Sequence, residues 1–270
     1  MNPVLEVSDL RVGDRLLDGI SLTVGPGERV GLIGESGSGK SLTALSVMGL
    51  LPRGLAAGGS VKILGQETVG LPDRRMRTLR GKVVSMVFQE PMTALDPLMT
   101  VGRQVAEAAG RRDVADLFTQ VALDPARMNA YPHELSGGQR QRVVIAMALA
   151  GEPDLLICDE PTTALDVTVQ DQILDLLDDL VDRLGISLLF ITHDLGVIKR
   201  MCRRVLVMSE GRVVEEGDTH QVLTAPAHPY TQRLVAAALP GPPAQVRETR
   251  EPVLALDRVT RRYGTTLALD

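Results

Sequence analysis

The stretch Gly34-Glu35-Ser36-Gly37-Ser38-Gly39-Lys40-Ser41 decides the fold of this chain. It fits the pattern G-x-x-x-x-G-K-[ST], a glycine-rich turn whose backbone N–H groups surround phosphate oxygens. Residues 29–33 before it form a short apolar run typical of a buried strand, and residues 42–50 after it carry apolar side chains at helical spacing. The motif requires this order of strand, turn and helix, so the sequence predicts a phosphate-binding loop for a nucleotide.

Two side chains of this loop have roles that follow from its chemistry. Lys40 can reach the β- and γ-phosphates, and the hydroxyl of Ser41 can ligate Mg²⁺. The N-terminus of the following helix adds partial positive charge. We expect the nucleotide site to include Gly34, Glu35, Ser36, Gly37, Ser38, Gly39, Lys40, Ser41 and Leu42. The alternative, a Gly/Ser-rich loop without a ligand, is disfavoured by the flanking strand and helix.

The bulk properties of the chain exclude several classes of protein. Its 270 residues are 44% hydrophobic and 23% charged, which is ample for a buried core. A net charge of −5 argues against nucleic acid as a partner. No apolar run reaches the length of a transmembrane helix. The two cysteines, Cys158 and Cys202, match no metal-ligand spacing and are expected to be reduced thiols.

The pattern of the chain predicts an α/β domain that is interrupted by helices. Residues 4–10 and 20–24 are expected to form paired strands, residues 57–60 a loop, and residues 61–64 and 83–88 further strands. Strand signals then vanish, and a helical insert is predicted from about residue 92 to 151. The α/β rhythm returns with strands at 155–159 and 187–192, a helix at 167–184 and a hairpin across residues 204–216.

The end of the chain repeats its beginning. The first domain is expected to span residues 1–240, and Pro240-Gly241-Pro242-Pro243 opens a linker over residues 241–251. Residues 254–259 then resemble residues 5–10, and Leu269-Asp270 echoes Leu17-Asp18. We interpret residues 252–270 as the start of a second, similar domain that is cut off here, with residues 254–259 in its first strand. The alternative is a C-terminal strand added to the first domain.

A second glycine-rich helix start lies about a hundred residues after the first. Leu135-Ser136-Gly137-Gly138-Gln139 opens a helix whose exposed N–H groups and Ser136 hydroxyl could bind an anion. Alone this would be an ordinary helix cap. Together with the phosphate-binding loop it resembles the signature of the ABC (ATP-binding cassette) ATPases over about residues 5–240. The resemblance implies a P-loop NTPase cassette with an antiparallel β subdomain and a helical insert.

The remaining motifs of that family follow in order. Residues 155–160 resemble the Walker B strand, which implies that Asp159 holds Mg²⁺ and that the adjacent Glu160 polarises the attacking water. Gln89 resembles the Q-loop glutamine near Mg²⁺ and that water. His193 resembles the switch histidine that contacts the γ-phosphate, and Ala164-Leu165-Asp166 resembles the D-loop. The implied catalytic residues are Glu160, His193 and Gln89, and the implied metal ligands are Ser41, Gln89 and Asp159.

The resemblance also implies partners and a place in the cell. ATP is expected between the phosphate-binding loop of one cassette and the Ser136–Gln139 signature of another, so that the second cassette is a partner. Two transmembrane permease subunits, and through them an extracytoplasmic solute-binding protein, complete an importer of this type. The cassette itself is expected to be peripheral on the cytoplasmic face of the membrane.

Finer features favour one branch of the family. Residues 88–97, residues 131–134 and His228-Pro229-Tyr230-Thr231 resemble the importers of oligopeptides, dipeptides and nickel. Two departures matter. No aromatic residue is present at Val12-Gly13-Asp14, where relatives stack adenine, although Tyr263-Gly264 supplies one in the second copy. No cysteine cluster follows Tyr230 in this stretch, so we predict no iron–sulfur centre there.

Three functions compete on the sequence alone. The first is the ATPase subunit of a peptide importer. The second is a non-transport tandem ABC ATPase acting in translation or DNA repair, which the short linker and the lack of a basic patch disfavour. The third is a pseudo-cassette that binds ATP without hydrolysis, against which Glu160 and His193 argue.

Overall fold

The computed structural model describes residues 2–89, 94–163, 165–238 and 257–269. The chain divides into two compact units, Met1–Ala238 and Leu239–Asp270. The expected linker at 241–251 lies outside the described residues.

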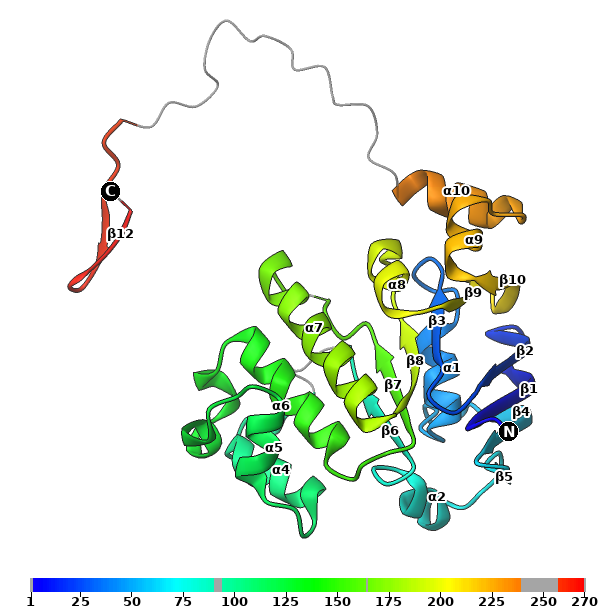
Figure 1. The fold of residues 1–270 in the computed structure, drawn as a ribbon, viewed down its shortest axis with the longest axis horizontal. Coiled ribbons are helices and arrows are strands. Elements are labelled where there is room, and N and C mark those ends of the chain that lie inside the picture. The colour runs from blue at the N-terminus through cyan, green and yellow to red at the C-terminus, as the bar shows by residue number, and fades with distance from the viewer. Residues whose placement is uncertain (1, 90–93, 164, 239–256, 270) are drawn as a thin grey trace, which may run out of the picture. The chain divides into compact units, whose positions relative to one another are not determined.

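Two sheets form the framework of the first unit (Figure 1). An antiparallel sheet has the order β2-β1-β4-β5, from β1 (Leu5–Val12), β2 (Leu17–Val24), β4 (Ala57–Ile63) and β5 (Gln66–Glu67). A six-stranded sheet has the order β10-β9-β3-β8-β7-β6, from β3 (Arg29–Ile33), β6 (Val84–Val87), β7 (Leu155–Asp159), β8 (Ser187–Ile191), β9 (Arg204–Ser209) and β10 (Arg212–Asp218). All its neighbours are parallel except the β9–β10 hairpin.

Helices complete the unit. They are α1 (Lys40–Val47), α2 (Asp73–Leu79), α4 (Val101–Ala109), α5 (Val114–Gln120), α6 (Gly137–Leu149), α7 (Val167–Leu184), α8 (Leu195–Met201), α9 (Thr219–Thr224) and α10 (Pro229–Ala238). The 3-10 turns η1 (Pro125–Asn129) and η2 (Pro132–Glu134) lie between α5 and α6. Helices α4, α5 and α6 gather at one side of the unit, away from β1 and β2 (Figure 1). They follow β6 and precede β7, where the sequence predicted a helical insert.

The central sheet separates two hydrophobic cores. Successive side chains of a strand point to opposite faces, so along β7 Leu156 and Cys158 pack on the side of α6 and α7. Leu155 and Ile157 pack on the other side, against the antiparallel sheet and α1. The strands are continuously apolar because both faces are covered. Their carboxyl ends therefore form the rigid edge on which the site is built.

One part of the expected framework is wrong. Residues 57–60 were predicted as a loop because of Gly58 and Gly59, but they belong to β4 and pair with β1. The register shifts between Ser8 and Arg11, where Asp9 has a φ of 50°. A Cβ atom at Gly59 would lie 2.2 Å from the Asp9 carbonyl oxygen. Gly59 is thus required by a bulge within the sheet, which local composition does not distinguish from a loop.

The second unit contains a short hairpin of β11 (Arg261–Tyr263) and β12 (Thr266–Leu269). Of the stretch 254–259 that was expected to form a strand, residues 257–259 are described and are not in one. The strand in this part of the chain begins at Arg261 instead.

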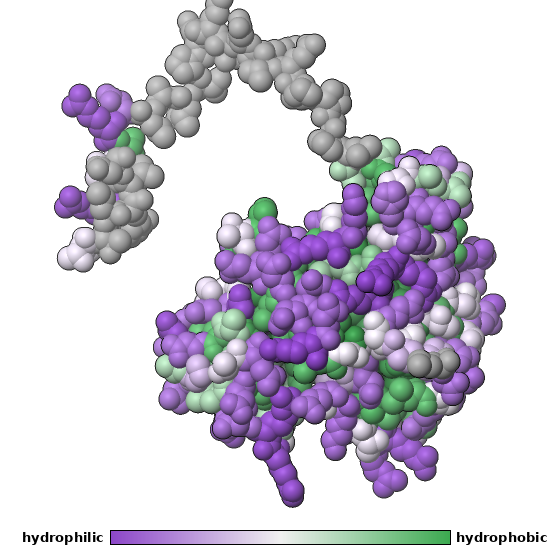
Figure 2. Space-filling view, viewed as in Figure 1, coloured by the Kyte–Doolittle hydropathy of each residue, from purple (hydrophilic) through white to green (hydrophobic). Residues whose placement is uncertain are grey.

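The face in Figure 2 is covered mainly by hydrophilic side chains, with small hydrophobic areas between them. None of the helices in the described residues is both long enough and apolar enough to cross a bilayer.

Candidate functional site

The phosphate-binding loop lies between the end of β3 and the start of α1. Gly34 has a φ of 152°, and a Cβ atom there would lie 2.2 Å from the carbonyl oxygen of Met208 on β9. A side chain at this position would therefore push the loop off the sheet. Helix α1 begins at Lys40, two residues earlier than the apolar pattern indicated. Ser41 and Leu42, predicted to take part in the site, lie in its first turn.

Lys40 is held inside this loop. Its Nζ atom donates hydrogen bonds to the carbonyl oxygens of Gly34 at 2.8 Å and Glu35 at 2.9 Å. Burial lowers the pKa of Lys40, and the nearby carboxylates of Glu160 and Asp159 oppose that shift. A lysine with its charge directed into the loop is suited to a polyanionic ligand.

Ser38 gives independent support for a ligand at the loop. Its hydroxyl oxygen is buried and has no hydrogen-bond partner among the described residues. A buried hydroxyl without a partner costs free energy. Phosphate oxygens of a bound nucleotide would supply the missing partner.

Asp159 brings the end of β7 to the same point. The Ser41 hydroxyl donates to Asp159 Oδ1 at 3.1 Å. Burial raises the pKa of Asp159, the Ser41 hydrogen bond opposes the rise, and the Glu160 charge adds to it. A buried carboxylate of this kind gains from a cation beside it.

Mg²⁺ fits the oxygen ligands that these residues provide. The Ser41 hydroxyl and the Asp159 carboxylate are 3.1 Å apart and are both hard donors. The described residues contain no cluster of three or more His, Cys, Asp or Glu side chains that could hold a metal by themselves. A site with few protein oxygens suits Mg²⁺, which takes its other ligands from water and substrate phosphates.

Glu160 is the centre of a hydrogen-bonded group of side chains. Its carboxylate accepts hydrogen bonds from Gln89 Nε2 at 3.2 Å and from Thr163 Oγ1 at 2.9 Å, and it lies 3.1 Å from Nδ1 of His193. Its backbone has a φ of 47°, and its N–H donates to the carbonyl oxygen of Ile191. The three predicted catalytic residues, Glu160, Gln89 and His193, are therefore brought together at the edge of the sheet.

A cavity of about 560 Å³ opens at this edge. Its walls are the start of the phosphate-binding loop, the hydrogen-bonded side chains around Glu160 and the last turns of α10. The lining residues are Gly34, Glu35, Ser36, Gln89, Glu160, Thr163, His193, Leu195, Leu234, Ala237 and Ala238. The cavity thus joins the predicted phosphate-binding and catalytic residues.

The signature segment does not line this cavity. Ser136 caps α6 in a reciprocal pair with Gln139: each backbone N–H is bonded by the side chain of the other residue. A Cβ atom at Gly138 would lie 2.5 Å from Cγ1 of Val169, so α6 packs closely on the start of α7. Ser136, Gly137, Gly138 and Gln139 are therefore grouped on a separate surface. Within one cassette they do not complete the cavity around Glu160.

The D-loop segment lies beside the signature. Leu165 would contact a Cβ atom at Gly137 at 3.3 Å, and Asp166 caps α7 by accepting from the N–H of Val169. Ala164 lies outside the described residues.

Two residues of the site were not assigned a role from sequence. Thr163 donates to the Glu160 carboxylate, and its place three residues after Glu160 in a turn is the signal that could have indicated it. The Tyr230 hydroxyl accepts a hydrogen bond from the N–H of Glu35. No local pattern in the sequence connects Tyr230 with Glu35, because the two residues are 195 positions apart.

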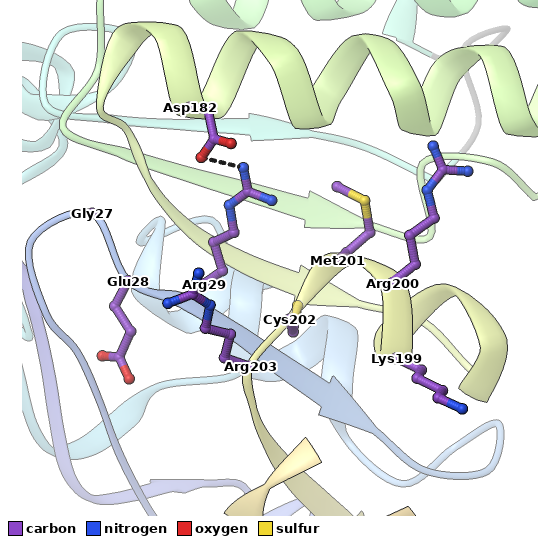
Figure 3. A pocket seen from close by; sticks show the side chains of 9 residues that line it. All are labelled: Gly27, Glu28, Arg29, Asp182, Lys199, Arg200, Met201, Cys202 and Arg203. Carbon is purple, nitrogen blue, oxygen red and sulfur yellow. Dashed lines mark ion pairs between the residues drawn. The ribbon is translucent and has the colours of Figure 1, made fainter. Parts of the chain in front are cut away.

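A further cavity of about 430 Å³ lies between the start of β3, the last turn of α7 and the end of α8 (Figure 3). It is lined by Gly27, Glu28, Arg29, Asp182, Lys199, Arg200, Met201, Cys202 and Arg203. Arg29 and Asp182 form an ion pair at 2.6 Å on its wall, and Arg200 pairs with Asp171 and Asp175. Its charges are mostly paired within the protein, and it contains none of the predicted site residues.

Comparison with known proteins identifies the family. The model described as ABC transporter matches residues 17–163, which is more than half of the chain. The chain belongs to the ABC transporter family. The phosphate-binding loop, Asp159, Glu160 and the signature all lie within the matched range.

Curated relatives are ATP-binding proteins of peptide transport. A probable peptide ABC transporter ATP-binding protein of Sinorhizobium fredii is 47% identical over 89% of this chain and 79% of its own length. The peptidoglycan transport ATP-binding protein YejF of Agrobacterium fabrum is 49% identical over 95% of this chain, and OppD of Mycobacterium tuberculosis is 50% identical over 88%. The chain spans about half the length of these last two, 51% and 42%. These relatives give no support to the alternative of a translation or DNA-repair ATPase.

Solved structures agree with the fold class. A dimeric ATP-binding cassette in a post-hydrolysis state with ADP and phosphate has a TM-score of 0.69 at 28% identity, covering 80% of this chain and 98% of the other. A cassette of an ABC transporter complex from Clostridium perfringens has a TM-score of 0.71 at 26% identity, covering 88% and 96%. The predicted P-loop cassette with an antiparallel subdomain is therefore confirmed.

Proposed function

We propose that this chain binds and hydrolyses ATP as the energy-supplying subunit of an importer for dipeptides or oligopeptides. The observation that carries the proposal is the convergence of Gln89, Thr163 and His193 on Glu160, beside a loop that holds Lys40 and Ser41. This arrangement supports hydrolysis rather than binding alone, so a pseudo-cassette is disfavoured.

The roles of the side chains follow from their positions. Lys40 and the N–H groups of the loop would bind the phosphates of ATP. Glu160 would accept a proton from the attacking water, and its hydrogen bonds from Gln89 and Thr163 orient the carboxylate. His193, whose side chain is 62% exposed, is free to turn toward the γ-phosphate.

Mg²⁺ would be held by Ser41, Asp159 and the Gln89 amide oxygen. When bound, the ion would neutralise charge on the phosphate oxygens during transfer. The protein contributes the orientation of these ligands: Asp159 is fixed by β7, and Ser41 by the first turn of α1.

A second cassette is proposed to complete the site. The Ser136–Gln139 signature presents a helix N-terminus on a surface apart from the chain's own phosphate-binding loop, so it is available to the nucleotide of a partner. Val167, next to the D-loop, has 76% of its surface exposed, which is consistent with a contact surface there. ATP would then hold the two cassettes together and hydrolysis would release them.

Residues 252–270 are proposed to begin such a second cassette. The backbone supports the repeat: Arg258 has a φ of 49°, as Asp9 has 50° at the matched position. Asp9 lies within the first strand of the β1–β2 hairpin, and Arg258 shortly precedes the β11–β12 hairpin. An ordinary C-terminal strand gives no reason for this agreement, since positive φ is uncommon outside glycine.

Permease subunits are the proposed membrane partners. Phe88 and Leu98 flank the Gln89 region and have 37% and 85% of their surfaces exposed. We take these two exposed apolar side chains as part of the candidate contact surface for the permease. Through two permease subunits the cassette would act on peptides delivered by an extracytoplasmic solute-binding protein. It would lie peripherally on the cytoplasmic face of the membrane, with no nucleic-acid partner.

Uptake of labelled peptide tests this function. A strain that lacks the protein should lose uptake of a radiolabelled tripeptide. Expression of the native protein from its own locus should restore the uptake. Glu160→Gln should not restore it. Uptake of a labelled sugar serves as the control. Unchanged tripeptide uptake in the deletion strain, with no other peptide importer present, would contradict the proposal.

A further inference from the structure

Helix α10 begins with the segment His228-Pro229-Tyr230-Thr231, which marked a branch of the family in the sequence but had no chemical role. Pro229 is the first residue of the helix, where its fixed φ is favourable and no N–H is needed. His228 Nδ1 accepts a hydrogen bond from the N–H of Tyr230 at 3.2 Å. The segment is therefore a capped helix start with a defined direction.

This helix start is anchored to the edge of the central sheet. The carboxylate of Glu215 on β10 accepts hydrogen bonds from the N–H of Ala227 at 2.8 Å and of His228 at 3.0 Å. A single charged side chain thus bonds two successive backbone groups, and bonds of this type are among the stronger ones in proteins. Tyr230 is consequently projected from a fixed position.

Tyr230 reaches the phosphate-binding loop. Its ring is buried, with 8% of its surface exposed, and its hydroxyl oxygen accepts a hydrogen bond from the N–H of Glu35 at 2.9 Å. The carbonyl oxygen of Glu35 accepts from Lys40 Nζ at 2.9 Å. The backbone of Glu35 is therefore held by Tyr230 on its N–H side and by Lys40 on its carbonyl side.

The same face of α10 borders the catalytic residues. Leu234, Ala237 and Ala238 follow Tyr230 by four, seven and eight residues, the spacing of one helical face. All three line the cavity that contains Glu160 and His193. Helix α10 is thus a wall of the site, and Tyr230 is its polar contact with the loop.

We propose that Tyr230 is a positioning residue for nucleotide binding: its hydroxyl fixes the Glu35 backbone so that Lys40 and the loop N–H groups are arranged for the phosphates before ATP arrives. Preorganisation of this kind improves affinity because less conformational entropy is lost when the ligand binds. Tyr230 acts through the loop and does not touch the phosphates. The proposal rests on the assignment of this loop as the nucleotide site.

The variant Tyr230→Phe removes the hydroxyl and keeps the buried ring with its contact to Arg233. Loss of one hydrogen bond to the loop should raise the Kd of MgATP about threefold to tenfold. The KM for ATP should rise by the same factor while kcat stays within twofold, because the groups around Glu160 are unchanged. Isothermal titration of the full chain and steady-state ATPase assays give the two values.

Gln232→Ala is the matched control. Gln232 is on the same helix and donates to the carbonyl oxygens of Pro226 and Ala227, but it has no bond to the loop. It should raise the Kd less than Tyr230→Phe does, because it keeps the Tyr230 hydroxyl and its hydrogen bond to Glu35. If Tyr230→Phe leaves the Kd unchanged, or if Gln232→Ala raises it equally, the positioning role is wrong. Lys40→Ala separates the role of Tyr230 from the assignment of the loop. If Lys40→Ala binds MgATP with the native Kd, the loop has been misassigned as the nucleotide site.

Discussion

At the scale of single residues, Glu160 combines a strained backbone with a dense set of hydrogen bonds. Its φ of 47° is rare outside glycine and costs about 1–3 kcal/mol. The hydrogen bond from its N–H to Ile191 and the bonds to its carboxylate stabilise this conformation. The adjacent carboxylates have different partners: Asp159 accepts from Ser41, whereas Glu160 lies among Gln89, Thr163 and His193.

The region expected to hold adenine has an aliphatic side chain and no ring. The connection after β1 runs through Gly13, Asp14, Arg15 and Leu16, and the Leu16 side chain is 52% exposed. A saturated side chain offers apolar contact without the stacking of an aromatic, which is worth about 1 kcal/mol. It also cannot distinguish the hydrogen-bonding edges of two purines.

We predict that the chain discriminates poorly between ATP and GTP. The contacts of Lys40 and the loop with the triphosphate are common to both nucleotides, so the two Kd values should agree within about fivefold. A competition titration of MgATP against MgGTP measures the ratio. A preference for ATP above about fiftyfold would mean that a polar group elsewhere recognises adenine.

At the scale of elements, Arg204 ties the two sheets together. On β9 it donates to Glu28 Oε1 at 2.7 Å and to the carbonyl oxygen of Thr23 on β2 at 2.6 Å, and it also pairs with Glu216 on β10. Glu28 in turn accepts from the N–H of Gly25 at 2.7 Å. This cluster fixes the turn that leads into β3 and the phosphate-binding loop.

Glu28→Gln should destabilise the protein by about 1–2 kcal/mol at neutral pH, because a charge-assisted bond is lost. Partial burial tends to raise the pKa of Glu28, but the bonds from Arg204 and Gly25 outweigh it and lower the pKa below its usual range. The stabilisation is therefore present above the usual pKa of a glutamate and is lost as the pH falls through the lowered pKa.

Thermal unfolding at several pH values measures this effect. The difference in Tm between the native chain and Glu28→Gln should be largest near neutral pH and should shrink as the pH falls through the lowered pKa of Glu28. Glu152→Gln is the control, because Glu152 is 68% exposed and pairs with Arg112 at 3.5 Å; it should change stability by less than about 0.5 kcal/mol. A Glu28→Gln difference that grew toward acidic pH would contradict the lowered pKa of Glu28.

The elements show what local sequence can predict. The strand 155–159 and the helix 167–184 agree with the structure at both ends, because apolar runs and periodicity are local signals. The first half of β4, residues 57–60, was missed because Gly59 is required by a bend in β1, its partner across the sheet. Its second half agrees with the strand predicted from residue 61.

Contacts within the site were predicted less completely than its residues. Motifs indicated Gln89, Glu160 and His193, and a resemblance gave their roles. The bonds from Thr163 to Glu160 and from Glu35 to Tyr230 depend on how distant segments pack. The second of these spans 195 residues, and no periodicity or spacing in one sequence encodes it.

At the scale of the whole molecule, the separation of the signature from the catalytic cavity is the main functional feature. Ser136 is exposed and its segment packs on Leu165 and Val169, apart from the lining of the cavity around Glu160. On the proposed function, one cassette would surround a γ-phosphate incompletely, and a second cassette would supply the remaining donors.

Ser136→Arg tests this division of labour. The chain's own loop should bind MgATP with a Kd within about twofold of the native value, since Ser136 does not line that cavity. Hydrolysis in the assembled transporter should fall at least tenfold, because a bulky cation fills the space meant for the partner's γ-phosphate. Ser136→Ala, which removes the cap without adding bulk, should have the smaller effect. Native ATPase activity of Ser136→Arg in the assembly would argue against a shared site.

Glu160→Gln tests the central claim most directly, that this chain hydrolyses ATP through the carboxylate at the end of β7. Gln keeps the size of the side chain and can still accept hydrogen bonds, but it cannot take up the proton from water. MgATP affinity and ATP turnover should be measured in parallel on the native and variant chains. We predict a Kd within about threefold of the native value and turnover reduced at least a hundredfold. Turnover at the native rate would contradict the assignment of Glu160 as the catalytic base.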